Sequence, residues 1–175
     1  MQKDSSSNKI IQTVTMGLLG AILFVGQLAM APLPNIEPVT TLIIIYTLVY
    51  KKKTFFSIYV FVLLEGLLFG FGIWWISYLY IWSILAVIVL ALHKLESAIL
   101  WAVVSGVFGL LFGALCAIPY LISGGIGAAF AYWTAGIPYD VLHCGGNFAL
   151  TLCLYTPLTQ LLKKLHHETQ SGQSL

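Results

Sequence analysis

The sequence has very few charged residues. Of its 175 residues, 8% are Asp, Glu, Lys or Arg, whereas 59% are hydrophobic and the mean hydropathy is +0.95. Soluble domains carry roughly 25% charged residues, and a water-soluble fold of this size could not cover so much apolar surface. The composition therefore excludes an ordinary soluble domain and predicts a protein whose solvent is the lipid bilayer.

The apolar runs lack the alternation of apolar and polar residues that marks the strands of a membrane barrel. Residues 54–72 and 82–92, for example, are apolar on all faces. In lipid every backbone polar group needs an internal partner, which leaves helix bundles and closed barrels as the only options. The fold class is therefore predicted to be all-α, a bundle of membrane-spanning helices.

Motifs for catalysis and for nucleotide binding are also missing. The sequence contains no Walker phosphate loop, no HExxH and no GxSxG. Its cysteines, Cys116, Cys144 and Cys153, do not have the spacing of zinc ligands. We therefore expect no enzyme activity, no intrinsic ATPase, no metal site and no cofactor. The net charge of +2 gives no reason to expect a nucleic-acid partner.

Six apolar segments are expected to form transmembrane helices within one domain at residues 10–165. Polar tails at 1–9 and 166–175 flank this domain. The predicted helices span residues 10–31, 37–50, 54–72, 77–92, 97–121 and 138–165. Between them lie a Pro-rich turn at 32–35, a turn bearing Trp74 and Trp75, and a Gly- and Ala-rich loop with a short helix at 122–136.

The first segment also resembles a secretory signal peptide, because lysines precede it and Ala29-Met30-Ala31 imitates a cleavage site. Its apolar stretch is longer than the usual ~7–15 residues of such signals. Pro32 would also stand directly after the cut. We therefore expect residues 10–31 to be retained as the first helix.

The basic residues predict the orientation in the membrane. If the N-terminus is cytoplasmic, six helices return the C-terminus to the cytoplasm, and every lysine then lies on that side. This is a strong positive-inside signal, and it predicts a multi-pass membrane protein. The lysines concerned are Lys3, Lys9, Lys51, Lys52, Lys53, Lys94, Lys163 and Lys164.

A polar stripe follows the last predicted helix. Asp140, His143 and Asn147 stand at positions i, i+3 and i+7, and Thr151 continues the same face. Three groups of different hydrogen-bonding character suit a small polar ligand, and they equally suit a network between helices.

A carboxylate and several aromatic residues are further candidates. Glu65 lies ~16 Å into the membrane from Thr54 at helical rise, where a carboxylate is costly unless paired or functional. It could bind a ligand or form a structural hydrogen bond. The aromatic candidates for stacking on a ligand are Trp74, Trp75, Tyr78 and Trp133, although an interfacial belt would show the same enrichment.

Small residues mark one face of the first helix. Gly17 and Ala21 stand four positions apart, which allows another helix backbone to approach closely. That helix could belong to an external partner or to the same chain.

One segment resembles a known family. Residues 136–148, GIPYDVLHCGGNF, and the YTPL at 155–158 are similar to the last helix of S components of energy-coupling factor (ECF) transporters. Six helices, this chain length, two cytoplasmic ends and a Pro-Asn turn after the first helix fit the same family. The resemblance implies a substrate-binding subunit that captures a vitamin or similar micronutrient from outside.

The resemblance also implies partners. An S component delivers its substrate together with a membrane T component and two cytoplasmic ATPases, and small residues on its first helix contact the T component. Gly17 and Ala21 match those residues loosely. Met1 is followed by Gln2 rather than His, which speaks against nickel or cobalt uptake.

The substrate is left open by the residues. Cobalamin is the first suggestion, because the glycine-rich outer loop leaves room for it; pantothenate, a pyridoxine-type vitamin and a nucleobase-like precursor are alternatives. A different class of function is a stand-alone proton-coupled transporter or channel in which Glu65 and His143 relay protons. A third is a scaffold subunit without a ligand.

Overall fold

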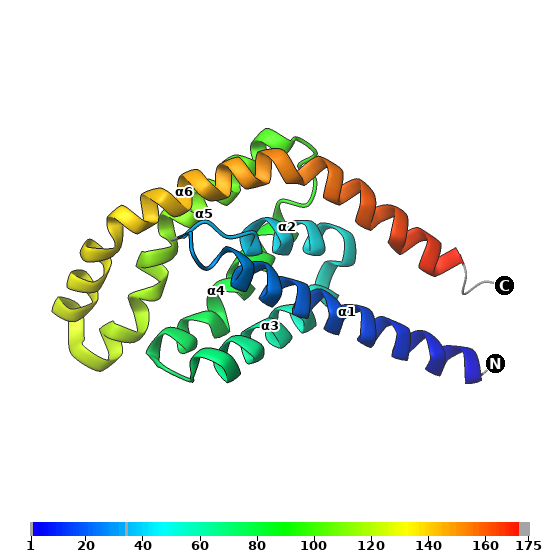
Figure 1. Ribbon diagram of the computed structural model, residues 1–175, viewed down its shortest axis with the longest axis horizontal. Helices are drawn as coiled ribbons and strands as arrows, with labels where there is room; N and C mark the ends of the chain where they lie inside the picture. The colour runs from blue at the N-terminus through cyan, green and yellow to red at the C-terminus, as the bar shows by residue number, and fades with distance from the viewer. Residues whose placement is uncertain (1, 34, 172–175) are drawn as a thin grey trace.

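The chain is all-helical, as predicted. The computed structural model in Figure 1 describes residues 2–33 and 35–171, and these residues contain six α-helices, one short 3-10 helix and no strand. The elements are α1 (Gln2–Met30), α2 (Val39–Tyr50), η1 (Lys51–Lys53), α3 (Thr54–Phe69), α4 (Ile73–Ala91), α5 (Ala98–Cys116) and α6 (Ile118–Ser171).

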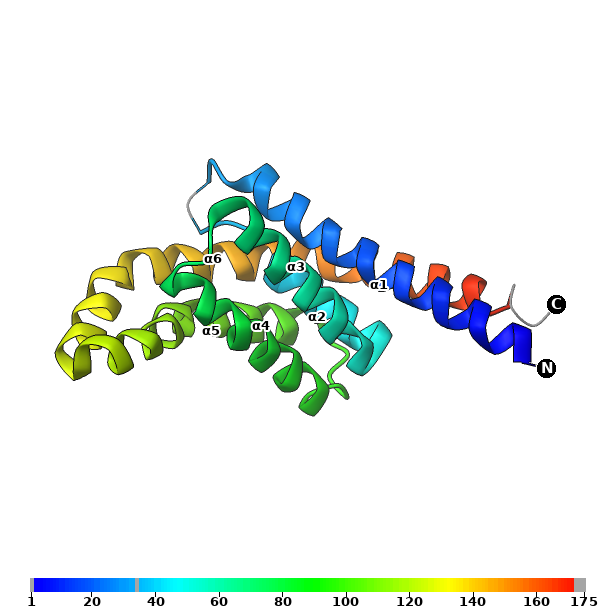
Figure 2. The ribbon, with the colours of Figure 1, turned by 90° about the horizontal axis from the view of Figure 1, so that it is seen from below.

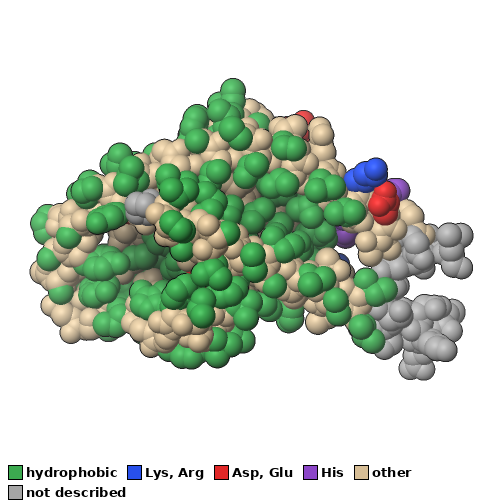
Figure 3. All heavy atoms as spheres, viewed as in Figure 1, with side chains coloured by type: hydrophobic (Ala, Val, Ile, Leu, Met, Phe, Trp, Pro, Cys, Tyr) green, Lys and Arg blue, Asp and Glu red, His purple; other side chains and the backbone are tan. Residues whose placement is uncertain are grey.

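Three of these helices are long and apolar enough to cross a membrane. Among the described residues they are Lys9–Met30, Ile73–Ala91 and Ala98–Cys116. Large apolar side chains also cover much of the surface, as Figure 3 shows; Leu18 of α1, for example, is 61% exposed. Such a surface is suited to lipid rather than to water, so the coarse prediction of a membrane protein agrees with the structure.

The turn predicted around Trp74 and Trp75 is wrong, because both residues lie in the first turn of α4. The chain reverses earlier, at Gly70, whose φ of +87° is a conformation that glycine adopts without steric cost. α3 therefore ends at Phe69, three residues before the predicted end at residue 72.

Residues 122–136, predicted as a loop with a short helix, are helical except at one position. They belong to α6, in which Gly125 has non-helical backbone angles (φ +75°, ψ −176°) and separates two helical stretches. The fifth helix ends at Cys116 rather than at residue 121, because Pro119 lacks a backbone donor and is accommodated in the first turn of α6.

The two polar tails are partly helical. α1 already begins at Gln2, and α6 continues to Ser171. Both termini lie at the same end of the molecule in Figures 1 and 2. The α2–α3 and α4–α5 connections lie toward that end, and the other three connections lie toward the opposite end. This is the grouping that the lysine distribution requires.

Glycines allow α5 and α6 to pack closely. A Cβ atom on Gly109 would lie 2.9 Å from the carbonyl carbon and oxygen of His143, and one on Gly106 would lie 3.3 Å from the oxygen of Cys144. A larger residue at Gly109 would meet backbone, which cannot rotate away. Gly106 and Gly109 of α5 therefore serve the packing within the protein, and this packing fixes the position of the polar stripe on α6.

We predict that Gly109→Ala lowers the thermal stability of the protein. The added methyl group must push α6 away from α5, and overpacking of this kind costs about 1–3 kcal/mol. The measurement is the melting temperature of the purified protein in detergent.

Gly145→Ala is the matched control, because a Cβ at Gly145, on the same pair of helices, meets nothing within 4 Å. Equal melting temperatures for the two variants would show that α5 and α6 are not in close contact.

Candidate functional site

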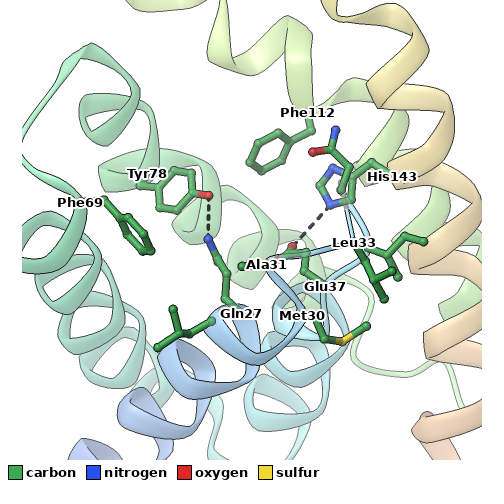
Figure 4. A pocket seen from close by; sticks show the side chains of 12 residues that line it. Gln27, Met30, Ala31, Leu33, Glu37, Phe69, Tyr78, Phe112 and His143 are labelled. Atoms are coloured by element: carbon green, nitrogen blue, oxygen red, sulfur yellow. Dashed lines mark hydrogen bonds and ion pairs between the residues drawn. The ribbon is translucent and has the colours of Figure 1, made fainter.

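A cavity of about 300 Å³ lies beside the α1–α2 connection (Figure 4). The last turn of α1 and the α1–α2 connection form one wall, and α3, α4, α5 and α6 contribute single side chains. Its polar lining residues are Gln27, Asn35, Glu37, Tyr78 and His143, and its aromatic lining also includes Phe69 and Phe112.

The α1–α2 connection is held against α6. The side-chain amide of Asn35 donates a hydrogen bond to the backbone oxygen of Tyr139 at 3.0 Å. A Cβ on Gly146 would lie 3.2 Å from the side chain of Ile36, so the connection lies close to the α6 backbone here. Asn35 itself has a φ of +57°, which asparagine tolerates better than most residues. These contacts place Glu37 at the cavity.

His143 and Glu37 point toward one another across the cavity (Figure 4). Nε2 of His143 lies 3.4 Å from Oε1 of Glu37, and both side chains are largely buried. Nδ1 of His143 and Oε2 of Glu37 have no hydrogen-bond partner in the described part of the chain. The ring of Phe112 packs edge-on against the imidazole, with 4.9 Å between the ring centroids. Both of these unpartnered atoms are buried, so the pair forms part of the cavity wall.

A second polar group surrounds Gln27. Its side-chain nitrogen lies 3.4 Å from Oε2 of Glu65 and 3.4 Å from the hydroxyl oxygen of Tyr78. Glu65 is 1% exposed, and its Oε1 atom has no hydrogen-bond partner among the residues described. Gln27 and Tyr78 line the cavity, whereas Glu65 lies behind them. The structure therefore places Glu65 next to the cavity, with the side chain of Gln27 between its carboxylate and the cavity surface.

The predicted stripe on α6 divides between two roles. His143 lines the cavity, but the amide of Asn147 donates to Oγ1 of Thr40 at 3.1 Å and approaches the backbone oxygen of Ser105 at 3.4 Å. Thr151 lies 2.8 Å from both Thr41 and Ser105 through its hydroxyl oxygen. Asn147 and Thr151 thus belong to a buried hydrogen-bond network that joins α2, α5 and α6. A network between helices was one of the two roles that the sequence left open for the stripe.

Asp140 is at the upper end of the stripe and does not line the cavity. Its Oδ1 atom accepts a hydrogen bond from the backbone nitrogen of Gly113 at 2.9 Å. A Cβ on Gly113 would collide with this carboxylate. The contact joins α5 to α6 and gives Asp140 a structural role in this arrangement, although its Oδ2 atom has no partner in the described residues.

The four aromatic candidates lie in different environments. Tyr78 lines the cavity, and Trp74 packs edge-on against it with 5.3 Å between ring centroids. Trp75 donates its indole N–H to the backbone oxygen of Val62 at 2.8 Å, a contact between α4 and α3. Trp133 is 38% exposed on α6 and pairs with Phe130, away from the cavity. The structure brings together Tyr78 and Trp74 but not Trp133.

Most lining residues were missed from the sequence as site candidates, among them Gln27, Glu37 and Phe112. Gln27 is the only polar side chain between Gly17 and Ala31, and this isolation in an apolar segment was a usable signal. Glu37 follows the Pro-rich turn, and its approach to α6 depends on how that connection folds. Phe112 is one of many phenylalanines in apolar helices, and nothing in the sequence distinguishes it.

Gly17 and Ala21 lie on an outward face of α1. A Cβ on Gly17 would meet nothing within 4 Å, whereas one on the nearby Gly20 would lie 2.7 Å from the backbone oxygen of Ser57 in α3. Ala21 is partly exposed. Gly20 is therefore the residue that allows α1 and α3 to approach, and Gly17 remains open to an external partner or to lipid.

Comparison with known proteins assigns the chain to no family. No protein-family model, no curated protein and no solved structure matches it significantly. The likeness of residues 136–158 to ECF S components therefore remains an expectation, and the function has to be argued from the cavity and from the distribution of apolar surface and charge.

Proposed function

We propose that this chain is the membrane-embedded substrate-binding subunit of an ECF-type importer, which captures a vitamin or related micronutrient outside a bacterial plasma membrane. The observation that carries the proposal is the cavity at one end of an apolar helical bundle, with unused polar atoms on Glu37 and His143. Buried polar atoms without partners are rare in proteins, and a bound ligand would supply the missing hydrogen bonds.

In this proposal all six helices cross the membrane, with both termini in the cytoplasm and the cavity facing outside. α2 has 12 residues and is shorter than the ~20 residues of an ordinary span. Its middle part, Ile43 to Ile45, is fully buried in the protein. A helix surrounded by other helices does not have to match the thickness of the lipid, because its neighbours satisfy its ends.

The partners follow from what the sequence does not contain. With no nucleotide-binding motif, active uptake would require the two cytoplasmic ATPases and the T component of such an importer. The open face of α1 at Gly17 and Ala21 is the proposed contact with the T component, since a second helix can approach a small residue closely.

The size of the cavity favours a small substrate. A volume of about 300 Å³ is at the lower end of the range for small-molecule sites. Pantothenate, a pyridoxine-type vitamin or a nucleobase-like precursor suits this volume better than the large corrin ring of cobalamin. The protruding segment 122–136, which suggested room for cobalamin, is helical rather than an open loop.

The alternative is a stand-alone proton-coupled transporter or channel. One observation favours it: Glu65 and His143, both nearly fully buried, each have a polar atom without a partner in the described residues. Ionisable residues at membrane depth are often proton relays. The two proposals differ in whether uptake needs ATP.

The first functional prediction separates these proposals. In liposomes the isolated protein should bind substrate without accumulating it, because it has no site for ATP. Addition of the T component and both ATPases should produce ATP-dependent uptake, measured with radiolabelled small molecules that co-purify with the protein.

Liposomes in which the ATPases carry an inactivated Walker lysine are the control for leakage. Accumulation driven by a proton gradient in the isolated protein would instead favour the stand-alone transporter.

A second prediction concerns the face of α1. Gly17→Leu or Ala21→Leu should reduce ATP-driven uptake, because the added bulk prevents close approach of the T component. Ligand affinity and melting temperature should stay near those of the wild type, since a Cβ at Gly17 has open space around it. Co-purification with the T component measures assembly directly.

Gly20→Leu is the contrasting variant, and it should lower the melting temperature because it collides with α3. If Gly17→Leu lowers the melting temperature as much as Gly20→Leu does, the face is packed internally and the assignment fails.

A third prediction divides the α6 stripe by role. His143→Ala should weaken ligand binding roughly tenfold to a hundredfold, because a hydrogen bond to a charged group contributes about 1.5–3 kcal/mol. Asp140→Ala and Asn147→Ala should mainly lower the ligand-free melting temperature, because each breaks contacts between helices. Dissociation constants and melting temperatures are measured in the same detergent.

Glu65→Ala should weaken ligand binding and also lower the melting temperature, since its partner Gln27 lines the cavity. A melting temperature that falls for His143→Ala with unchanged affinity would remove His143 from the site.

A further inference from the structure

The cavity contains no fixed positive charge. Its lining includes no lysine, and the chain has no arginine at all. The η1 lysines and the lysines near the end of α6 lie toward the termini, at the other end of the molecule. Recognition of a carboxylate or phosphate normally uses arginine or lysine, and the only lining side chain that can become positive is His143.

The protonation of His143 does not change this balance. An imidazolium at this buried position depends on the carboxylate of Glu37 at 3.4 Å, which cancels its charge. Glu65 adds a second carboxyl group behind Gln27. The one basic side chain of the lining thus already stands beside a carboxylate, and an acidic ligand would find no unpaired positive group among the lining residues.

The aromatic lining favours the same ligand chemistry. Phe69, Tyr78 and Phe112 come from three different helices and line one side of the cavity. Aromatic faces attract cations by about 0.5–2 kcal/mol, and they stack on flat rings. The carboxylate of Glu37, whose side chain is 13% exposed, belongs to the same lining.

We propose that the substrate is a small, flat nitrogen heterocycle that bears a protonated amino group and no acidic group. This inference rests on the proposed function, and it specifies the substrate class of the same cavity. The amino group is placed at the carboxylate of Glu37, and the ring lies against Phe112 and Tyr78. The class excludes carboxylate-bearing vitamins such as pantothenate.

The experiment uses three probes on one ring, which differ in charge but hardly in size: 3-(aminomethyl)pyridine, pyridine-3-methanol and pyridine-3-carboxylate. Dissociation constants are measured by equilibrium dialysis at pH 7 with the purified full-length protein in detergent. We expect the aminomethyl probe to bind at least tenfold more tightly than the carboxylate, with the alcohol between them. Glu37→Gln, which keeps the shape of the side chain, should reduce the difference to less than threefold.

Glu168→Gln is the matched control. It removes the same charge from an exposed glutamate near the C-terminal end of α6 and should leave the preference unchanged. Equal or tighter binding of the carboxylate, or no saturable binding of any probe, would overturn the substrate class.

The failure of this inference is distinguishable from failure of the proposed function. If the carboxylate binds best while the T component and ATPases still drive uptake, the substrate class alone is wrong. If the aminomethyl probe is preferred but the partners produce no ATP-dependent uptake, the cavity chemistry stands and the importer proposal is wrong.

Discussion

The close contact between α5 and α6 is the constraint on which the rest of the structure depends. Glycines on α5 bring the backbone of α6 so near that a single methyl group at Gly109 would collide with it. Buried polar groups need hydrogen-bond partners inside the protein, and this contact brings such partners to the polar residues of α6. The contact gives Asp140 a backbone donor and gives Asn147 and Thr151 partners on α2 and α5.

His143 is the residue of this face that the packing leaves least satisfied. It faces the cavity rather than α5, and its ring meets Glu37 from the α1–α2 connection and Phe112 from α5. The close contact between α5 and α6 fixes the position of His143, and the α1–α2 connection completes the cavity. The hydrogen-bond network of Asn147 and Thr151 therefore positions the cavity wall, and one sequence stripe contributes to both.

The cavity has an electrostatic character that follows from the membrane itself. A charge-poor chain keeps its lysines at connections and ends, so no cation remains for the interior. Among the described residues, the buried acidic and basic side chains are the carboxyl groups of Glu65 and Asp140 and the imidazole of His143. This composition restricts what the cavity can recognise as strongly as its shape does, and it connects the positive-inside pattern of the sequence with the chemistry of the proposed substrate.

The sequence by itself determined the all-helical class and the position of most helices, and it singled out Glu65 and His143 as candidates, because long apolar runs and isolated polar residues are local signals. It did not determine that Trp74 and Trp75 are helical or that residues 122–136 form part of α6, since Gly70 and Gly125 set those bends through backbone angles. Only the tertiary structure separated His143 from Asn147 and brought in Gln27, Glu37 and Phe112. These residues lie far apart in the chain, and the packing of α1, α5 and α6 decides which of them meet.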